Sequence, residues 1–236
     1  MAHVCVSERH RHVHRRRDSH DCYVPWHQYP ADGETSTAEQ TRLRRVPQTN
    51  AYIDMTAKHI YFAGGCFWGT EHFFKQINGV VSTEVGFANG RTDAPTYEQV
   101  YTDTTGYAET VHVVYAPSQV PLEFLLRMFF AAIDPTSLNK QGHDEGTRYR
   151  TGIYYTDAAD LPIIEQVYAE EQSKYAQPLV VEKRPLRNFY PADEYHQDYL
   201  DKHPDGYCHL PKALFDFART TTPAGYTRPP GSEKED

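Results

Sequence analysis

The 236-residue chain lacks a hydrophobic run long enough to cross a bilayer, and it has only four cysteines. A membrane-spanning helix needs about 20 consecutive apolar residues, so we expect no membrane span. The cysteines match neither the spacing of a zinc site nor the dense disulfide framework of a small secreted domain. We therefore expect a cytoplasmic chain in which a cysteine serves chemistry rather than a permanent disulfide.

The chain also lacks an excess of positive charge, because its formal net charge is −8. This balance argues against a general binder of nucleic acid or anionic membranes. The N-terminus has no apolar stretch of the kind that secretory signals carry. Nothing in these features points to a nucleic-acid or membrane partner.

Composition divides the chain into three parts. Residues 1–54 are rich in His, Arg, Pro, Thr and Gln and show no apolar period, so we expect a disordered polar extension. The HRHVHRRR run within it could bind a metal or an acidic partner, but nothing fixes its histidines in one geometry. We expect the catalytic domain at residues 55–220 and a polar tail at residues 221–236.

Hydrophobic periodicity predicts strands that alternate with helices between residues 58 and 203. The predicted strands lie at 58–63, 80–88, 109–116, 148–156 and 179–184, and the predicted helices at 66–77, 121–133, 161–175 and 193–203. Helices interleaved with strands of alternating polarity are typical of a mixed sheet with helices packed on it.

The segment AGGCFWGTEHFF at residues 63–74 places a lone cysteine, Cys66, after two glycines and before two aromatic rings. The glycines permit a sharp turn between a strand and a helix. A thiol at a helix N-terminus meets free N–H groups and the positive end of the helix dipole, which lower its pKa. Phe67 and Trp68 either belong to the core or form an apolar wall beside the thiol. The segment predicts an activated nucleophile.

This segment resembles the GCFWG signature of the type-A peptide methionine sulfoxide reductases. The resemblance continues in family order through VVSTEVGFANG, APTYEQV, TTGYAETVHVVY, GHDEGTRYRTGIYY, FYPADEYHQDYL and DGYCHL, and it covers roughly residues 58–210. It implies a single α+β domain, a two-layer sandwich of a mixed, largely antiparallel sheet with packed helices. It also implies a peptide-methionine (S)-S-oxide reductase that repairs oxidative damage in free and protein-bound methionine.

The resemblance assigns roles around the thiol. Cys66 would attack the sulfoxide sulfur, while Phe67 and Trp68 would hold the methyl group of the substrate. Glu109, in the segment GYAE, would be the catalytic acid. A carboxyl group that is protonated at neutral pH needs a raised pKa, which burial beside apolar rings supplies.

Three further side chains complete the implied site. Tyr97 and Tyr149 would donate hydrogen bonds to the sulfoxide oxygen, as oxyanion donors do, and Asp144 would organise the site. Each of these residues has an ordinary structural explanation when taken alone, because the chain has 18 tyrosines and 32 acidic residues. Their joint order around the cysteine motif favours the catalytic interpretation.

The resemblance also implies a recycling route. Attack would leave a sulfenic acid on Cys66, and a second thiol would condense with it to give a disulfide that thioredoxin reduces. We predict Cys208, in DGYCHL, as this resolving thiol, with Cys5 and Cys22 as rivals. We expect no metal or organic cofactor, because the electrons come from thiols, and we expect a monomer.

The chain departs from the family at three positions. Phe87 and Tyr107 stand where family members often have tyrosine and histidine, and we expect these changes to alter packing rather than chemistry. Tyr101 occupies a position where some members carry a further cysteine. The recycling route therefore rests on the single cysteine near the C-terminus.

Two other functions remain open at this point. A cysteine hydrolase would use Cys66 as an acylating nucleophile and His196 or His143 as the base. No motif places either histidine against the thiol. A binding module for oxidised proteins would not require the complete set of acid and oxygen-binding residues.

Overall fold

The structure is a computed structural model, and it describes residues 57–229. The extension predicted at residues 1–54, with Cys5 and Cys22, lies outside the described residues. None of the helices within the described range combines the length and the apolar character that a membrane span requires.

The strands are β1 (Lys58–Gly64), β2 (Val80–Ala88), β3 (Ala108–Tyr115), β4 (Lys140–Gln141), β5 (Asp144–Glu145), β6 (Thr151–Tyr155), β7 (Glu182–Pro185) and β8 (Phe189–Pro191). The α-helices are α1 (Phe67–Lys75), α2 (Tyr97–Tyr101), α3 (Leu122–Ala132), α4 (Leu161–Gln172), α5 (Tyr199–Lys202) and α6 (Lys212–Thr220), and three short 3₁₀ turns are η1 (Thr147–Tyr149), η2 (Ala158–Asp160) and η3 (Pro223–Gly225).

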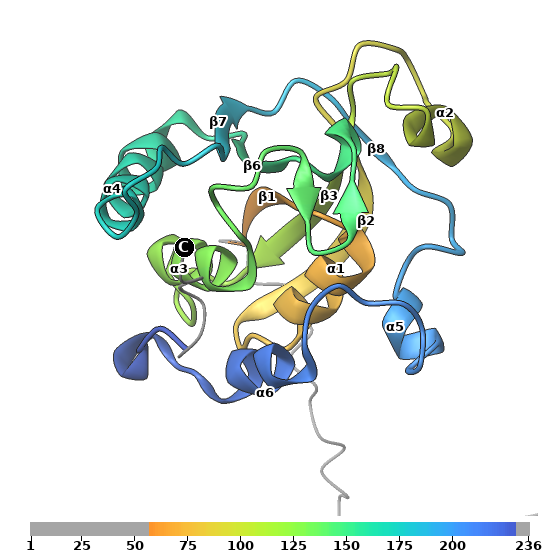
Figure 1. The fold of residues 1–236 in the computed structure, drawn as a ribbon. Coiled ribbons are helices and arrows are strands. Elements are labelled where there is room, and N and C mark those ends of the chain that lie inside the picture. Colours follow the sequence, from red (N-terminus) through yellow and green to blue (C-terminus); the bar gives the residue numbers. More distant parts are fainter. Residues whose placement is uncertain (1–56, 230–236) are drawn as a thin grey trace, which may run out of the picture. The chain divides into compact units, whose positions relative to one another are not determined.

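Six strands form one sheet in the order β7-β6-β1-β3-β2-β8 (Figure 1). All neighbouring pairs in this sheet are antiparallel except β6 and β7, which are parallel. The strands β4 and β5 form a separate small hairpin. The predicted α+β fold with a mixed, largely antiparallel sheet is confirmed.

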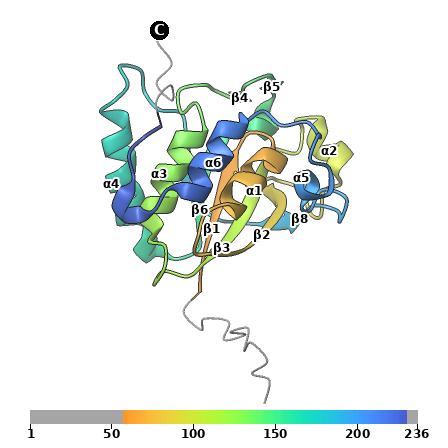
Figure 2. The ribbon, with the colours of Figure 1, turned by 90° about the horizontal axis from the view of Figure 1, so that it is seen from below.

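The alternating side chains of β1 show how the sheet separates two environments. Phe62 points into the main core, where its ring stacks on Phe74 of α1 at 4.5 Å and on Phe129 of α3 at 4.9 Å between centroids. The neighbouring residue Ala63 belongs to a small cluster on the opposite face. Strand side chains alternate between the two faces of a sheet. The helices α1 and α3 therefore pack on the face to which Phe62 points (Figure 2).

Several elements differ from the sequence prediction. The strand predicted from residue 148 begins only at Thr151, because the residues before it form η1. Asp103 fixes this turn by accepting hydrogen bonds from the backbone and guanidinium of Arg148. The helix predicted at residues 193–203 is reduced to α5, and the elements α2, α6, β4, β5 and β8 were not predicted. The three strands and α2 span at most 5 residues each, and α6 buries only Phe215 and Ala218.

The chain after α6, predicted as part of a polar tail, packs on the helical layer as far as it is described. The Tyr226 hydroxyl donates a hydrogen bond to the carbonyl of Arg127 at 3.3 Å. Arg228 pairs with the fully buried carboxylate of Glu171 at 2.5 Å. Tyr226 and Arg228 therefore anchor this part of the chain to α3 and α4.

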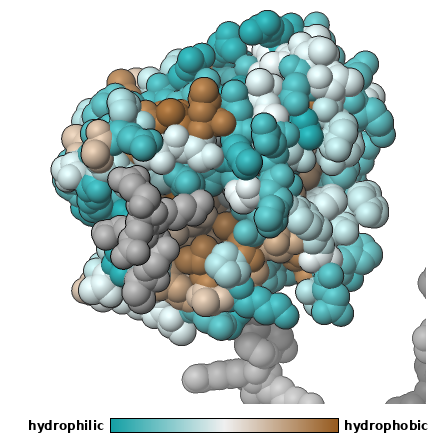
Figure 3. All heavy atoms as spheres, viewed as in Figure 1, coloured by the Kyte–Doolittle hydropathy of each residue, from teal (hydrophilic) through white to brown (hydrophobic). Residues whose placement is uncertain are grey.

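A cavity of about 1050 Å³ lies between the C-terminal end of α3, α6 and the chain that follows α6. Ile133, Leu214 and Phe217 are among its apolar lining residues, and His209 also lines it. Figure 3 shows apolar side chains gathered on this face in the region of α6.

Candidate active site

Cys66 lies between β1 and α1, at the N-cap of the helix, as the sequence predicts. The turn is made by Gly65, whose φ of 86° is a left-handed conformation that favours glycine. A Cβ at this position would also lie 2.7 Å from the Cβ of Gln141, so a side chain has no room there. The two glycines thus position the thiol at the start of α1.

The Cys66 thiol is only 6% exposed, and this burial decides its ionisation. Burial raises its pKa well above the usual value, and the nearby carboxyls of Glu109 and Asp144 raise it further. The backbone N–H groups of Trp68 and Gly69 oppose this effect by hydrogen bonding to the sulfur. The predicted lowering of the thiol pKa by the helix N-terminus is therefore wrong for this state, because desolvation outweighs two hydrogen bonds.

Glu109 lies on β3 with an exposed fraction of 1%, and it reaches the same helix N-terminus. Its Oε2 accepts a hydrogen bond from the backbone N–H of Phe67 at 3.0 Å. Burial raises the pKa of Glu109 to about 8, although this hydrogen bond lowers it. A carboxyl with this pKa keeps its proton at neutral pH, which is the property that a catalytic acid needs.

Tyr97 and Tyr149 bring two phenols to the site from α2 and η1. Burial raises the pKa of Tyr97 to about 12 and raises that of Tyr149 as well, and Glu109 and Cys66 contribute to both shifts as neighbouring charges. Both hydroxyls therefore keep their protons and can donate hydrogen bonds. Arg148 lies over the Tyr149 ring at 4.4 Å, so the ion pair of Arg148 with the Asp103 carboxylate also holds this tyrosine.

Phe67 and Trp68 form the apolar part of the site. Phe67 is 1% exposed and lies against Phe87 with 5.8 Å between ring centroids. Trp68 is half-buried and stacks on Tyr199 at 3.7 Å. Phe67 is therefore also a core residue, and Trp68 lies at the edge of the core.

His196, the base of the hydrolase alternative, lies among aromatic rings. It stacks on Tyr97 at 4.5 Å and on Trp68 at 5.7 Å. Its Nδ1 is buried without a hydrogen-bond partner within the described residues. This packing makes it a wall of the site, beside the tyrosine and the tryptophan.

Asp144 and Cys208 approach the site from the β4–β5 hairpin and from the chain between α5 and α6. Asp144 Oδ1 accepts a hydrogen bond from the Tyr207 hydroxyl at 2.8 Å. The sulfur of Cys208 lies over the first turn of α1, because a Cβ at Gly69 would stand only 2.9 Å from it. Cys208 is half-buried, and both Cys208 and Cys66 are free thiols.

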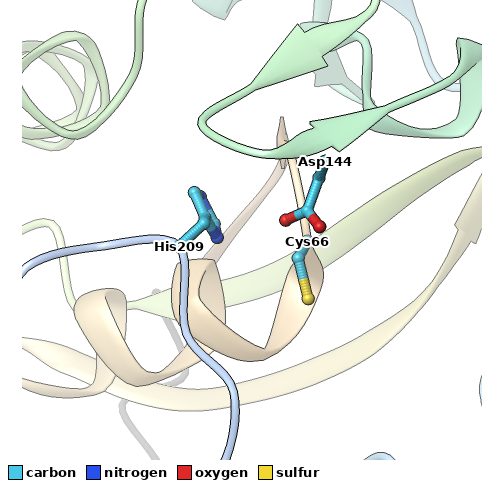
Figure 4. A group of neighbouring side chains, drawn as sticks. All are labelled: Cys66, Asp144 and His209. Atoms are coloured by element: carbon cyan, nitrogen blue, oxygen red, sulfur yellow. The ribbon is translucent and has the colours of Figure 1, made fainter.

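Figure 4 shows a side chain that the sequence analysis did not select, His209, beside Cys66 and Asp144. One donor atom from each of the three lies within 4.8 Å of the others, so together they could offer ligands to a metal ion. The Tyr207 hydroxyl and the Gly64 carbonyl already hold Asp144 and His209 by hydrogen bonds. The only signal for His209 in the sequence is its place next to Cys208.

Residues 58–223 match the peptide methionine sulfoxide reductase family. A peptide methionine sulfoxide reductase MsrA of Clostridium acetobutylicum is 57% identical over 157 residues, which are 66% of this chain and 97% of the relative. The MsrA of Lachnoclostridium phytofermentans is 56% identical over 162 residues, which are 69% of this chain and 98% of the relative.

A solved structure gives the same result. The crystal structure of Mxr1 from Saccharomyces cerevisiae in reduced form matches with a TM-score of 0.63 and 38% identity, over 73% of this chain and 93% of that chain. The family match spans most of the chain and includes every residue of the site described above. The chain belongs to the type-A peptide methionine sulfoxide reductase family.

Proposed function

We propose that this enzyme reduces the S epimer of methionine sulfoxide, free or in oxidised proteins, by transferring the oxygen to Cys66. The observation that carries the proposal is the buried Glu109 carboxyl, which accepts a hydrogen bond from the first turn of the helix that begins after Cys66. Burial raises its pKa to about 8, so this carboxyl keeps its proton at neutral pH. A sulfoxide sulfur is a poor electrophile until its oxygen receives a proton or strong hydrogen bonds. A protonated carboxyl beside a thiol meets this requirement, because it can give its proton to the sulfoxide oxygen.

The reductase step moves one oxygen atom and two electrons. The Cys66 sulfur attacks the sulfoxide sulfur while Glu109 gives its proton to the oxygen. The oxygen passes to Cys66, so methionine leaves as a thioether and the cysteine becomes a sulfenic acid. The thiol proton of Cys66 restores Glu109, which leaves the proton count unchanged.

Substrate positioning follows from the walls of the site. Phe67 and Trp68 offer an apolar surface to the methyl group, and the hydroxyls of Tyr97 and Tyr149 donate to the oxygen. Losing one such donor typically slows a reaction about 100- to 1000-fold. Asp144, held by Tyr207, orders the side of the site that faces the hairpin.

Recycling uses Cys208 as the resolving thiol. It condenses with the Cys66 sulfenic acid to form a disulfide and water, and the thioredoxin dithiol then reduces this disulfide. The support is the position of the Cys208 sulfur over the first turn of α1. We assign no metal to the site because thiols supply the electrons, and we propose that the enzyme acts as a monomer in the cytoplasm.

The test counts methionine formed per enzyme in the absence of a reductant. Wild type and Cys208→Ser should each form about one methionine from methionine sulfoxide, and Cys66→Ser should form none. Cys208→Ser should accumulate a dimedone-reactive sulfenic acid and turn over poorly with thioredoxin. Peptide mapping of wild type should find a Cys66–Cys208 disulfide. A hydrolase or a binding module would form no methionine, and normal cycling of Cys208→Ser with thioredoxin would refute the recycling assignment.

A further inference from the structure

His209 is held in one tautomer by its hydrogen bond to the backbone. Its Nε2 lies 3.2 Å from the carbonyl oxygen of Gly64. A carbonyl oxygen can only accept, so Nε2 must carry the hydrogen. In the neutral ring Nδ1 is then a bare lone pair, and this atom is buried without a hydrogen-bond partner among the described residues.

The bare Nδ1 lies near the resolving thiol. The position that a Cβ would take at Gly69 lies 2.9 Å from Cys208 Sγ and 3.1 Å from His209 Nδ1. Both atoms therefore flank one small space above the first turn of α1. One of the ring nitrogens also lies within 4.8 Å of the Cys66 sulfur, and Figure 4 shows the His209 ring beside Cys66.

We propose that His209 is the proton-transfer residue of the resolving step. Nδ1 takes the proton of the Cys208 thiol as its sulfur attacks the sulfur of the Cys66 sulfenic acid. The S–S bond forms, the S–O bond breaks, and the imidazolium returns the proton to the departing hydroxide, which leaves as water. Thiol and sulfenic acid thus give a disulfide and water, with no outside oxidant or base. This inference rests on the proposed role of Cys208.

The surroundings of His209 suit a base that is neutral before the reaction. Burial lowers its pKa, and the Asp144 carboxylate and the Gly64 carbonyl oppose that effect. The titratable groups around the ring are the thiols of Cys66 and Cys208, the Asp144 carboxylate and, bonded to that carboxylate, Tyr207. Burial raises the pKa of Cys208, so its thiol needs a base to react at neutral pH.

His209→Gln separates proton transfer from a structural role. The amide nitrogen of glutamine can take the place of Nε2 and still donate to the Gly64 carbonyl, but nothing replaces the Nδ1 lone pair. Single-turnover experiments should record two rates in the same sample, the rate of methionine formation and the rate at which the Cys208 thiol is lost. The rate of Cys208 thiol loss, divided by the rate of methionine formation, should fall about 100-fold at pH 7, a typical contribution of general base catalysis.

The pH profile makes the test specific. Without the base, disulfide formation must wait for ionisation of the Cys208 thiol, so the defect of His209→Gln should shrink as pH rises from 7 to 9.5. A wild-type ratio of rates, or a defect of the same size at every pH, would overturn the proposal. Loss of the methionine burst in wild type would instead refute the proposed function.

A second variant covers the case in which glutamine disturbs the segment. His209→Ala removes the ring, and the cavity of about 1050 Å³ that His209 lines offers added imidazole a way in. Imidazole should restore disulfide formation in proportion to its concentration, and the methylated base 1,2-dimethylimidazole tests how closely the ring must fit. A slowed variant that imidazole does not accelerate, with a defect independent of pH, would overturn the proposal.

Discussion

The side of the site that holds Glu109 and the side that holds Cys208 differ in how the chain is fixed. Glu109 lies on β3, which pairs with β1 and β2, and its exposed fraction is 1%. Cys208 lies between α5 and α6 in a stretch without strand or helix, next to Tyr207, which is 45% exposed. Segments with few buried contacts and few backbone hydrogen bonds open at low free energy.

This difference corresponds to the two parts of the reaction. The reductase step needs the acid and the phenols fixed around the sulfoxide, because misplaced groups lose most of their effect on rate. The resolving step needs the Cys208 sulfur to approach Cys66 closely enough to form a bond. A central strand suits the first requirement, and a segment without strand or helix suits the second. Changes on the sheet side should therefore affect methionine formation, and changes on the segment side should affect disulfide formation.

The largest expected effect belongs to the sheet side. Glu109→Gln keeps the acceptor for the Phe67 N–H but has no proton to give, so the methionine burst should slow about 100- to 10,000-fold at neutral pH. Disulfide formation would then be limited by the burst. Stopped single turnovers with methionine analysis give this rate.

Glu71 provides a matched control for that experiment. It is another buried carboxyl, 2% exposed, and burial raises its pKa to about 7. Its hydrogen bonds come from the hydroxyl of Thr83 and the backbone N–H of Asp198. Glu71→Gln should keep the burst rate within a few-fold. Equal losses in both variants would mean that burial of any carboxyl, rather than the proton of Glu109, determines the rate.

The same pair predicts how stability depends on pH. The folded-state pKa of Glu109, about 8, lies above the ordinary value of 4.5. The folded state therefore binds more protons than the unfolded state between these pH values, and the free energy of unfolding should fall as pH rises through this window. A shift of this size corresponds to a few kcal/mol, since one pKa unit is about 1.4 kcal/mol.

Glu109→Gln should remove most of that slope. It should equal wild type in stability near pH 4.5 and exceed it at pH 8, where wild type has to ionise a buried carboxyl. Glu71→Gln should flatten the curve less, because burial raises the pKa of Glu71 only to about 7. Urea unfolding at a series of pH values measures both curves, and an unchanged slope in Glu109→Gln would contradict the assignment of its pKa.

Local patterns in the sequence were sufficient for much of this structure. The glycine turn and the helix at Cys66 were predicted because strand, turn and helix signals follow each other directly in the chain. The roles of Glu109, Tyr97 and Tyr149 came from the family resemblance, and the structure brings all three around the thiol.

The remaining features depend on contacts between distant parts of the chain. The Cys66 thiol pKa was predicted from the helix alone, whereas burial in the folded chain reverses its direction. His209 was missed because its role depends on the Gly64 carbonyl, 145 residues earlier in the chain. The turn η1 was predicted as strand because the Asp103 carboxylate that fixes it is 45 residues away from Arg148. Such long-range contacts leave no local periodicity.

The smallest expected effect tests the segment side alone. Gly69 lies in α1 under the Cys208 sulfur, and a Cβ there would stand 2.9 Å from this sulfur and 3.1 Å from two atoms of the His209 ring. Gly69→Ala must therefore push the segment away while it leaves the Gly69 N–H at the Cys66 sulfur in place. Disulfide formation should slow about 10-fold, less than the roughly 100-fold that a misplacement of about 1 Å can cost, because a loosely held segment adjusts.

The helix itself gains from this substitution, since alanine in a helix is favoured over glycine by about 1 kcal/mol. A slower disulfide step therefore cannot be attributed to a weakened α1. In the Cys208→Ser background, Gly69→Ala should leave the methionine burst within about two-fold, because the Gly69 N–H stays at the Cys66 sulfur and Glu109 on β3 is not moved. Thiol counting after a single turnover gives the disulfide rate. If Gly69→Ala slows the burst as much as the disulfide step, the two sides of the site are not independent, and the division of the reaction between sheet and segment fails.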